Sequence, residues 1–134
     1  MSNEWFDELG RIFSLLPKYE DAYTGLGRLY LRLLDEATRN SGIHLAGCFS
    51  KTDYLLKQKN APPVLRRIVN DTRLRLTTDT QAQCKENFII DFQALCHFIA
   101  LLYDVSIPKA FCEKFVGQDI VENPSKFSNV ILYG

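Results

Sequence analysis

Basic residues are concentrated in one short segment of a chain that is neutral as a whole. Residues 51–75 contain seven lysines and arginines but two acids, Asp53 and Asp71, so this segment carries a net charge of +5. The rest of the 134-residue chain carries −5, because the totals are 16 basic and 16 acidic residues. Such an asymmetry indicates an anionic partner, most often nucleic acid. The seven basic residues are Lys51, Lys57, Lys59, Arg66, Arg67, Arg73 and Arg75.

One predicted helix carries all four arginines of this segment, and helical spacing divides them between two stripes. Arg66 and Arg73 are seven residues apart and should share one exposed side. Asp71 lies four residues from both Arg67 and Arg75, so it can pair with either and neutralise part of the second stripe. The free charge is then chiefly that of Arg66 and Arg73, with Lys51, Lys57 and Lys59. Planar guanidinium groups suit phosphates, and lysines add salt-sensitive affinity.

An aromatic side chain near these charges would be able to stack on a base. Tyr54 is the better candidate, because Phe49 fits the apolar stripe of its helix and is expected in the core. Two other interpretations stay open: the charges are solvated groups that meet the acidic flanks, or they dock onto an acidic protein or a sister domain. The predicted contact residues are Lys57, Lys59, Arg66, Arg67, Arg73, Arg75 and Tyr54.

No pattern typical of catalysis accompanies this charge. The phosphate-binding loop Gly-x-x-x-x-Gly-Lys-Ser/Thr is absent, and Gly25-Leu26-Gly27 lacks a preceding strand and a third glycine, which favours a role in close helix packing. His97 would share one side of a helix with Gln93 and Asp104, which allows proton transfer, although a histidine bonded to a neighbour is commoner there. We predict that this chain alone is not an enzyme.

Metal and cofactor sites are not expected either. Zinc needs clustered cysteines and histidines, whereas the four cysteines are widely spaced and the two histidines are far apart. In a cytosolic protein such cysteines are most simply small buried hydrophobic residues. They are Cys48, Cys84, Cys96 and Cys112.

The size and apolar content predict one domain with its own core. The longest apolar run, residues 98–103, is far shorter than the roughly 20 residues that a membrane-spanning helix needs. The N-terminal residues are acidic and lack the features of a signal peptide. We therefore expect a cytoplasmic protein with no membrane partner.

Apolar residues recur at three- and four-residue spacing along most of the chain, which predicts helices almost throughout. The fold class expected is all-α, a bundle of five to six helices around a long central helix at 79–104. A capping cluster at residues 77–80 should open that helix. The third helix should begin near Leu45, or later if Ser50 and Asp53 form a capping box. The expected helices are a first one that stops at Pro17, then 20–38, 45–59, 63–76, 79–104 and 108–116.

The C-terminal residues differ in character from the rest. Val130–Tyr133 favours a strand, yet no partner strand is predicted, and an unpaired strand is not stable. We expect a helical domain at 1–122 and an extended tail, or the start of another domain, at 123–134.

Three stretches resemble a known family. Residues 49–56, 63–68 and 73–75 are similar to the helical region that precedes the ATPase core of some bacterial superfamily I DNA helicases. The phosphate loop and the Asp-Glu pair that define that family are absent here. The resemblance implies a non-catalytic N-terminal accessory domain that contacts nucleic acid or the motor domain, with the motor beyond Gly134.

Two further functions remain as alternatives. The first is a protein-interaction or assembly module that presents Trp5, Phe6 and Phe13 to a second chain. The second is an enzyme or small-ligand domain built around His97 and Asp104.

Overall fold

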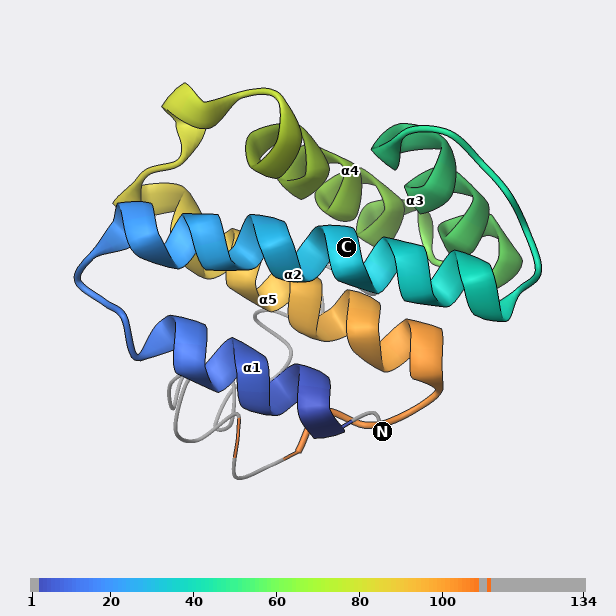
Figure 1. The fold of residues 1–134 in the computed structure, drawn as a ribbon, viewed down its shortest axis with the longest axis horizontal. Coiled ribbons are helices and arrows are strands. Elements are labelled where there is room, and N and C mark those ends of the chain that lie inside the picture. The colour runs from blue at the N-terminus through green and yellow to red at the C-terminus, as the bar shows by residue number, and fades with distance from the viewer. Residues whose placement is uncertain (1–2, 109–110, 112–134) are drawn as a thin grey trace.

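The computed structural model describes residues 3–108 and residue 111 (Figure 1). Within these residues the protein is entirely helical, which confirms the predicted all-α class. Apart from Pro108 and Phe111, the predicted helix at 108–116 and the predicted tail at 123–134 lie outside the described residues. Cys112 also lies outside them. The elements are α1 (Asn3–Phe13), α2 (Tyr19–Asn40), α3 (Cys48–Gln58), α4 (Pro63–Thr77), the 3-10 turn η1 (Thr80–Ala82) and α5 (Lys85–Tyr103).

Helix α5 is the centre of the bundle. In Figure 1, α2 crosses the front of the molecule with α5 behind it, α1 on one side and α3 and α4 on the other. Helix α5 packs against α1, α2 and α4. Six consecutive side chains, from Asp91 to Cys96, are buried, as is usual for a helix surrounded by others. None of the described helices is long and apolar enough to cross a membrane.

The aromatic face of α1 is part of the core. Trp5 and Phe6 are buried, and the Trp5 ring stacks on Tyr103 with ring centroids 6.2 Å apart. Phe13 meets Phe92 edge-to-face at 5.2 Å. Contrary to the expectation that they face a second chain, Trp5 and Phe6 therefore belong to the core of this domain, whereas Phe13 is half-buried.

Close packing also explains the glycine in α2. A Cβ atom added to Gly25 would lie 2.9 Å from the Cγ1 atom of Ile12, which is too close for an ordinary contact. Gly25 thus lets α1 and α2 approach each other, as its sequence context predicted.

The predicted helix ends agree with the structure only in part. Helix α1 ends at Phe13, four residues before the Pro17 that was expected to stop it. Helix α4 begins at Pro63, as expected. Helix α3 begins at Cys48, because Gly47 precedes it with a φ of +85° that favours glycine.

The predicted single helix at 79–104 is interrupted near its start. The side-chain amide of Gln83 donates a hydrogen bond to the carbonyl of Arg75 at 2.7 Å, and that of Asn87 donates one to Ala82 at 2.9 Å. These bonds hold η1 and the following residues in a turn that reverses the chain between α4 and α5. Helix α5 is consequently shorter than expected, and α2, with 22 residues, is the longest described helix.

Candidate functional site

Arg75 is not part of an exposed binding surface. Its Nε atom donates to both carboxylate oxygens of Asp91, at 2.9 and 3.0 Å, and its Nη2 atom lies 2.7 Å from Oδ1. Asp91 is fully buried and also accepts hydrogen bonds from the hydroxyls of Tyr23 and Thr72, each at 2.8 Å. This network joins α2, α4 and α5, so Arg75 has a structural role.

The pKa values of the network follow from these contacts. The hydrogen bond to Asp91 raises the pKa of Arg75 above its ordinary value, so the guanidinium stays charged. Burial, followed by the hydrogen bond to Asp91, raises the pKa of the Tyr23 phenol, which therefore stays protonated and donates. The pairing of Arg75 with Asp91 also corrects the expectation for Asp71, which makes no ion pair with Arg75 or with the exposed Arg67.

The three lysines of the basic segment are all neutralised within the domain. Lys57 pairs with Asp53 at 2.9 Å, one turn away on α3. Lys59 pairs with Asp104 at 3.2 Å. Lys51 pairs with Asp35 of α2 at 2.7 Å. Part of the positive charge therefore meets the acidic flanks in the folded domain, as one of the sequence interpretations expected.

Two arginines keep free hydrogen-bond donors on one side of α4. The Nε atom of Arg66 donates to the carbonyl of Ala61 at 2.8 Å. The Nε atom of Arg73 donates to Oδ1 of Asn70 at 3.3 Å, and the Asn70 amide donates back to the carbonyl of Arg66 at 3.0 Å. The terminal nitrogens of both arginines have no protein acceptor among the described residues. We call Arg66, Asn70 and Arg73 the α4 arginine stripe.

Phe49 lies beside this stripe and not in the core, contrary to its predicted position. Its side chain is 56% exposed, and the Arg73 guanidinium carbon lies 5.0 Å from the centre of its ring. The inner side of α3 is formed instead by Thr52, Leu55 and Leu56, with Cys48 partly buried. Helical spacing places Cys48, Thr52 and Leu55 on one side as readily as Phe49, Thr52 and Leu56, and only packing against α2 and α4 distinguishes the two registers.

An open groove adjoins Phe49 along the outer side of α3. Its volume is about 570 Å³. Within it, the Gln58 side-chain amide donates to the Tyr54 hydroxyl at 3.3 Å. Phe49 therefore lies between the groove and Arg73. We call this hollow the α3 groove, and its lining residues are Leu45, Phe49, Ser50, Asp53, Tyr54, Lys57 and Gln58.

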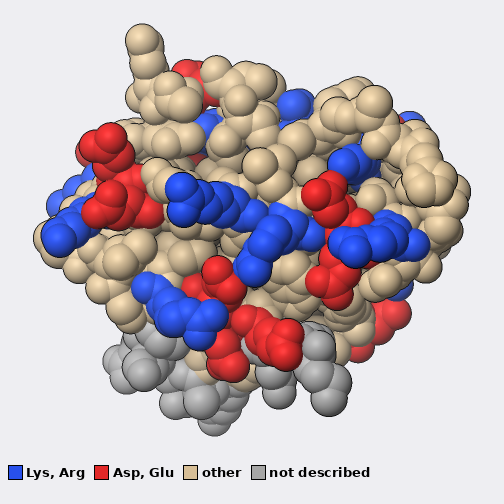
Figure 2. Space-filling view, in the orientation of Figure 1, with Lys and Arg blue, Asp and Glu red and all other residues tan. Residues whose placement is uncertain are grey.

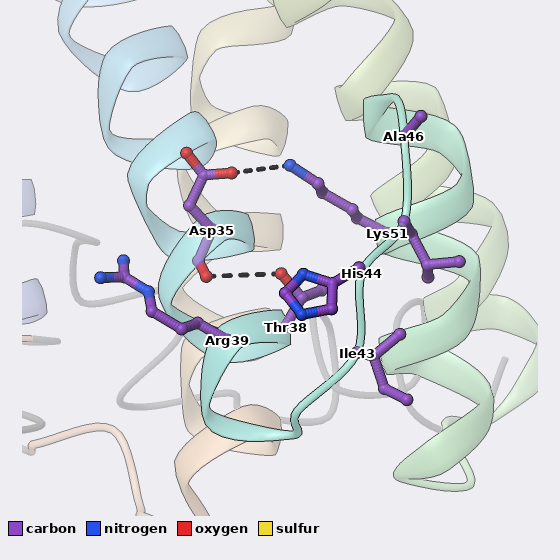
Figure 3. A pocket seen from close by; sticks show the side chains of 8 residues that line it. Asp35, Thr38, Arg39, Ile43, His44, Ala46 and Lys51 are labelled. Carbon is purple, nitrogen blue, oxygen red and sulfur yellow. Dashed lines mark hydrogen bonds and ion pairs between the residues drawn. The ribbon is translucent and has the colours of Figure 1, made fainter.

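A second hollow, of about 620 Å³, lies between the end of α2 and the start of α3 (Figure 3). Figure 3 shows Lys51 reaching across it to the Asp35 carboxylate, whereas the Arg39 side chain points away from Lys51. His44 is exposed at its edge. The Asp35 carboxylate and the Lys51 ammonium already neutralise each other. This hollow is therefore less suited to binding an anion than the α4 arginine stripe.

The surface around α2 has mixed charge. Figure 2 shows acidic and basic side chains side by side across the face that α2 crosses. One such pair joins Arg32 to Glu8 at 2.8 Å, with the Arg32 guanidinium carbon 5.6 Å from the centre of the Trp5 ring. A face with both signs of charge in close contact attracts a polyanion weakly.

The residues considered for proton transfer have other surroundings. Burial lowers the pKa of His97 to about 4, so its imidazole is neutral at pH 7 and a weak base. Asp104 ends α5 in a left-handed conformation, with φ +53°, and its carboxylate binds Lys59. Gln93 is buried. Of these three residues only Asp104 carries a carboxylate, and Lys59 already binds it.

The cysteines are only partly as expected. Cys96 is buried, whereas Cys48 and Cys84 are half-buried, and all three are free thiols. The described residues bring no three histidine, cysteine or acidic side chains together in a way that would hold a metal ion.

Comparisons with models of known protein families, with curated proteins and with solved structures found no match to this chain. The protein's own surface is therefore the basis on which a function can be assigned.

Proposed function

We propose that this domain binds nucleic acid through the α4 arginine stripe and serves as a non-catalytic accessory domain of a helicase-like protein. The observation that supports this most is the state of its two arginines. In Arg66 and Arg73 the Nε atom is bonded within the protein, while the terminal nitrogens are left for a ligand. Each guanidinium is thus held in position before binding, which reduces the entropy lost when it pairs with a phosphate.

The spacing of the stripe agrees with a polyanion as ligand. Seven residues of α-helix place Arg66 and Arg73 about 10 Å apart along α4, because the rise is about 1.5 Å per residue. One small anion cannot bridge that distance, but successive phosphates of one strand can contact both side chains. Exposed Arg67 on the same helix adds to the positive field. An acidic sister domain would recognise the same charges. The following experiment distinguishes a nucleic-acid partner from such a domain.

Binding to nucleic acid should be salt-dependent and should rely on the stripe. Titration of a fluorescein-labelled oligothymidylate of 20 nucleotides, followed by anisotropy, should show affinity that falls linearly with salt on logarithmic axes. Arg66→Ala combined with Arg73→Ala should weaken binding more than about tenfold, because each charged hydrogen bond contributes about 1.5–3 kcal/mol. The slope should also decrease by about 1.4, since each single-strand phosphate contact contributes about 0.7.

Arg28→Ala is the matched control, because Arg28 is an exposed arginine on α2 without an ion pair to the described residues. This variant should bind like the parent. Circular dichroism should show that every variant keeps its helical content. If the parent does not bind at low salt, or the double variant binds as tightly as the parent, nucleic acid is not the ligand of this stripe.

A further inference from the structure

We infer that the α3 groove receives an unstacked nucleobase, so that this surface selects single-stranded over duplex nucleic acid. The inference rests on the proposed function and adds the class of nucleic acid to it. Its basis is Phe49, which belongs to two features. The Phe49 ring contacts Arg73 of the α4 arginine stripe, and the same residue lines the α3 groove.

Phe49 has the largest exposed fraction of the six exposed large hydrophobic residues in the described part of the chain. A phenylalanine that is 56% exposed gives up much of the stabilisation that burial of its ring would bring. It lies at the second position of α3, where an outward-facing residue would ordinarily be polar. The contact with Arg73 fixes the ring as a flat apolar surface next to a cation. Such a pairing of an aromatic ring with a neighbouring positive charge is what single-strand-binding surfaces use to stack bases and hold the backbone.

The groove has the chemistry that a base requires. The groove, with a volume of about 570 Å³, is largely open to solvent, so a flat group would lie against its wall and would not be enclosed. Leu45 and the rings of Phe49 and Tyr54 supply apolar surface. The amide of Gln58 donates to the Tyr54 hydroxyl, so the hydroxyl proton remains to donate to an acceptor on a base.

The position of the cations favours a nucleic acid over an apolar peptide in this groove. The fixed Arg73 lies on the ring that borders the groove, so a ligand is expected to carry negative charge directly beside its flat group. A nucleotide has this arrangement. Bases inside a duplex are stacked and paired, so they cannot enter the groove. A duplex would therefore contact the arginines alone.

The test compares three ligands of 20 nucleotides at one salt concentration by fluorescence anisotropy: oligothymidylate, the same backbone with abasic sites throughout, and a duplex. The parent should bind the oligothymidylate roughly tenfold more tightly than the other two, because stacking on one aromatic residue contributes about that much. Phe49→Leu keeps an apolar side chain but removes the ring. This variant should lose roughly tenfold for the oligothymidylate. It should lose less than about fivefold for the abasic strand and the duplex, for which only the contact of the ring with Arg73, worth about 0.5–1 kcal/mol, is removed.

Phe49→Trp is the conservative variant and should keep or strengthen the parent's preference for the oligothymidylate. Equal binding of all three ligands by the parent would overturn the inference, as would a Phe49→Leu variant that keeps the parent's preference. Either result leaves the proposed function standing as long as the arginine variants still weaken binding. A parent that binds none of the three ligands would overturn both.

Discussion

Arg75→Met should lower the free energy of unfolding by about 3 kcal/mol, because it leaves the Asp91 carboxylate buried without its counter-charge. Asp91 has no exposed surface, while the Arg75 side chain is 19% exposed, which places the effect near the lower end of the usual range of about 3–5 kcal/mol. The hydroxyls of Tyr23 and Thr72 remain as donors but supply no charge. Urea unfolding followed by circular dichroism measures the difference.

Arg67→Met is the matched control, because Arg67 is an exposed arginine on the same helix. It should change stability by less than about 0.5 kcal/mol. Adding Asp91→Asn to the Arg75→Met variant should recover part of the loss, because the asparagine is neutral and still offers an oxygen to the two hydroxyls. If Arg75→Met is as stable as the parent, the buried pair does not hold α4 to α5 in the way the geometry indicates.

The domain should lose about 3 kcal/mol of stability through His97 alone as the pH falls from 7 to 4. Burial lowers the pKa of His97 from 6.5 to about 4 in the folded state. Between these values the unfolded chain binds a proton that the folded domain does not, so the unfolding free energy decreases as the pH falls. The contribution is fully present above about pH 6.5 and is lost on the way down to about pH 4. The size of this contribution follows from the difference between the folded and unfolded pKa values, at about 1.36 kcal/mol per pKa unit.

His97→Gln removes this titration and keeps a polar side chain. Stability measured by urea unfolding at pH 7, 6, 5 and 4 should fall less steeply for this variant than for the parent, whatever its stability at pH 7. Carboxylates that titrate in the same range act on both proteins and cancel in the comparison. Parallel curves for the parent and His97→Gln would show that His97 is readily protonated in the folded domain.

Much of the candidate site could be predicted, because it depends on spacing along one helix. The seven-residue interval between Arg66 and Arg73 places both on one side of α4 wherever that helix packs. Tyr54, the residue that the sequence suggested for stacking, lines the α3 groove. The aromatic residue that the structure places closest to the arginines is nevertheless Phe49, which the apolar pattern assigned to the core.

One missed residue had a signal in the sequence. Asp91 is a lone acid within the apolar stretch that continues from Phe88 to Tyr103. A charged residue in a helix that is apolar on all sides needs a buried partner, since an unpaired charge in a core is very costly. The sequence indicates that need, but it does not identify the partner, because α4 alone carries four arginines.

The amino-acid sequence by itself determined the all-α class, the start of α4 at Pro63 and the arginines that share a stripe, because each depends on interactions within a few residues. The tertiary structure decided that Arg75 binds Asp91, that the lysines are neutralised and that Phe49 is exposed. Each of these depends on which helices lie side by side, since burial and ion pairing are set by neighbours distant in the chain. The positive charge of residues 51–75 is therefore a property of the sequence. The pairing of its lysines and of Arg75 with acids, which leaves Arg66, Arg67 and Arg73 without an ion pair among the described residues, is a property of the fold.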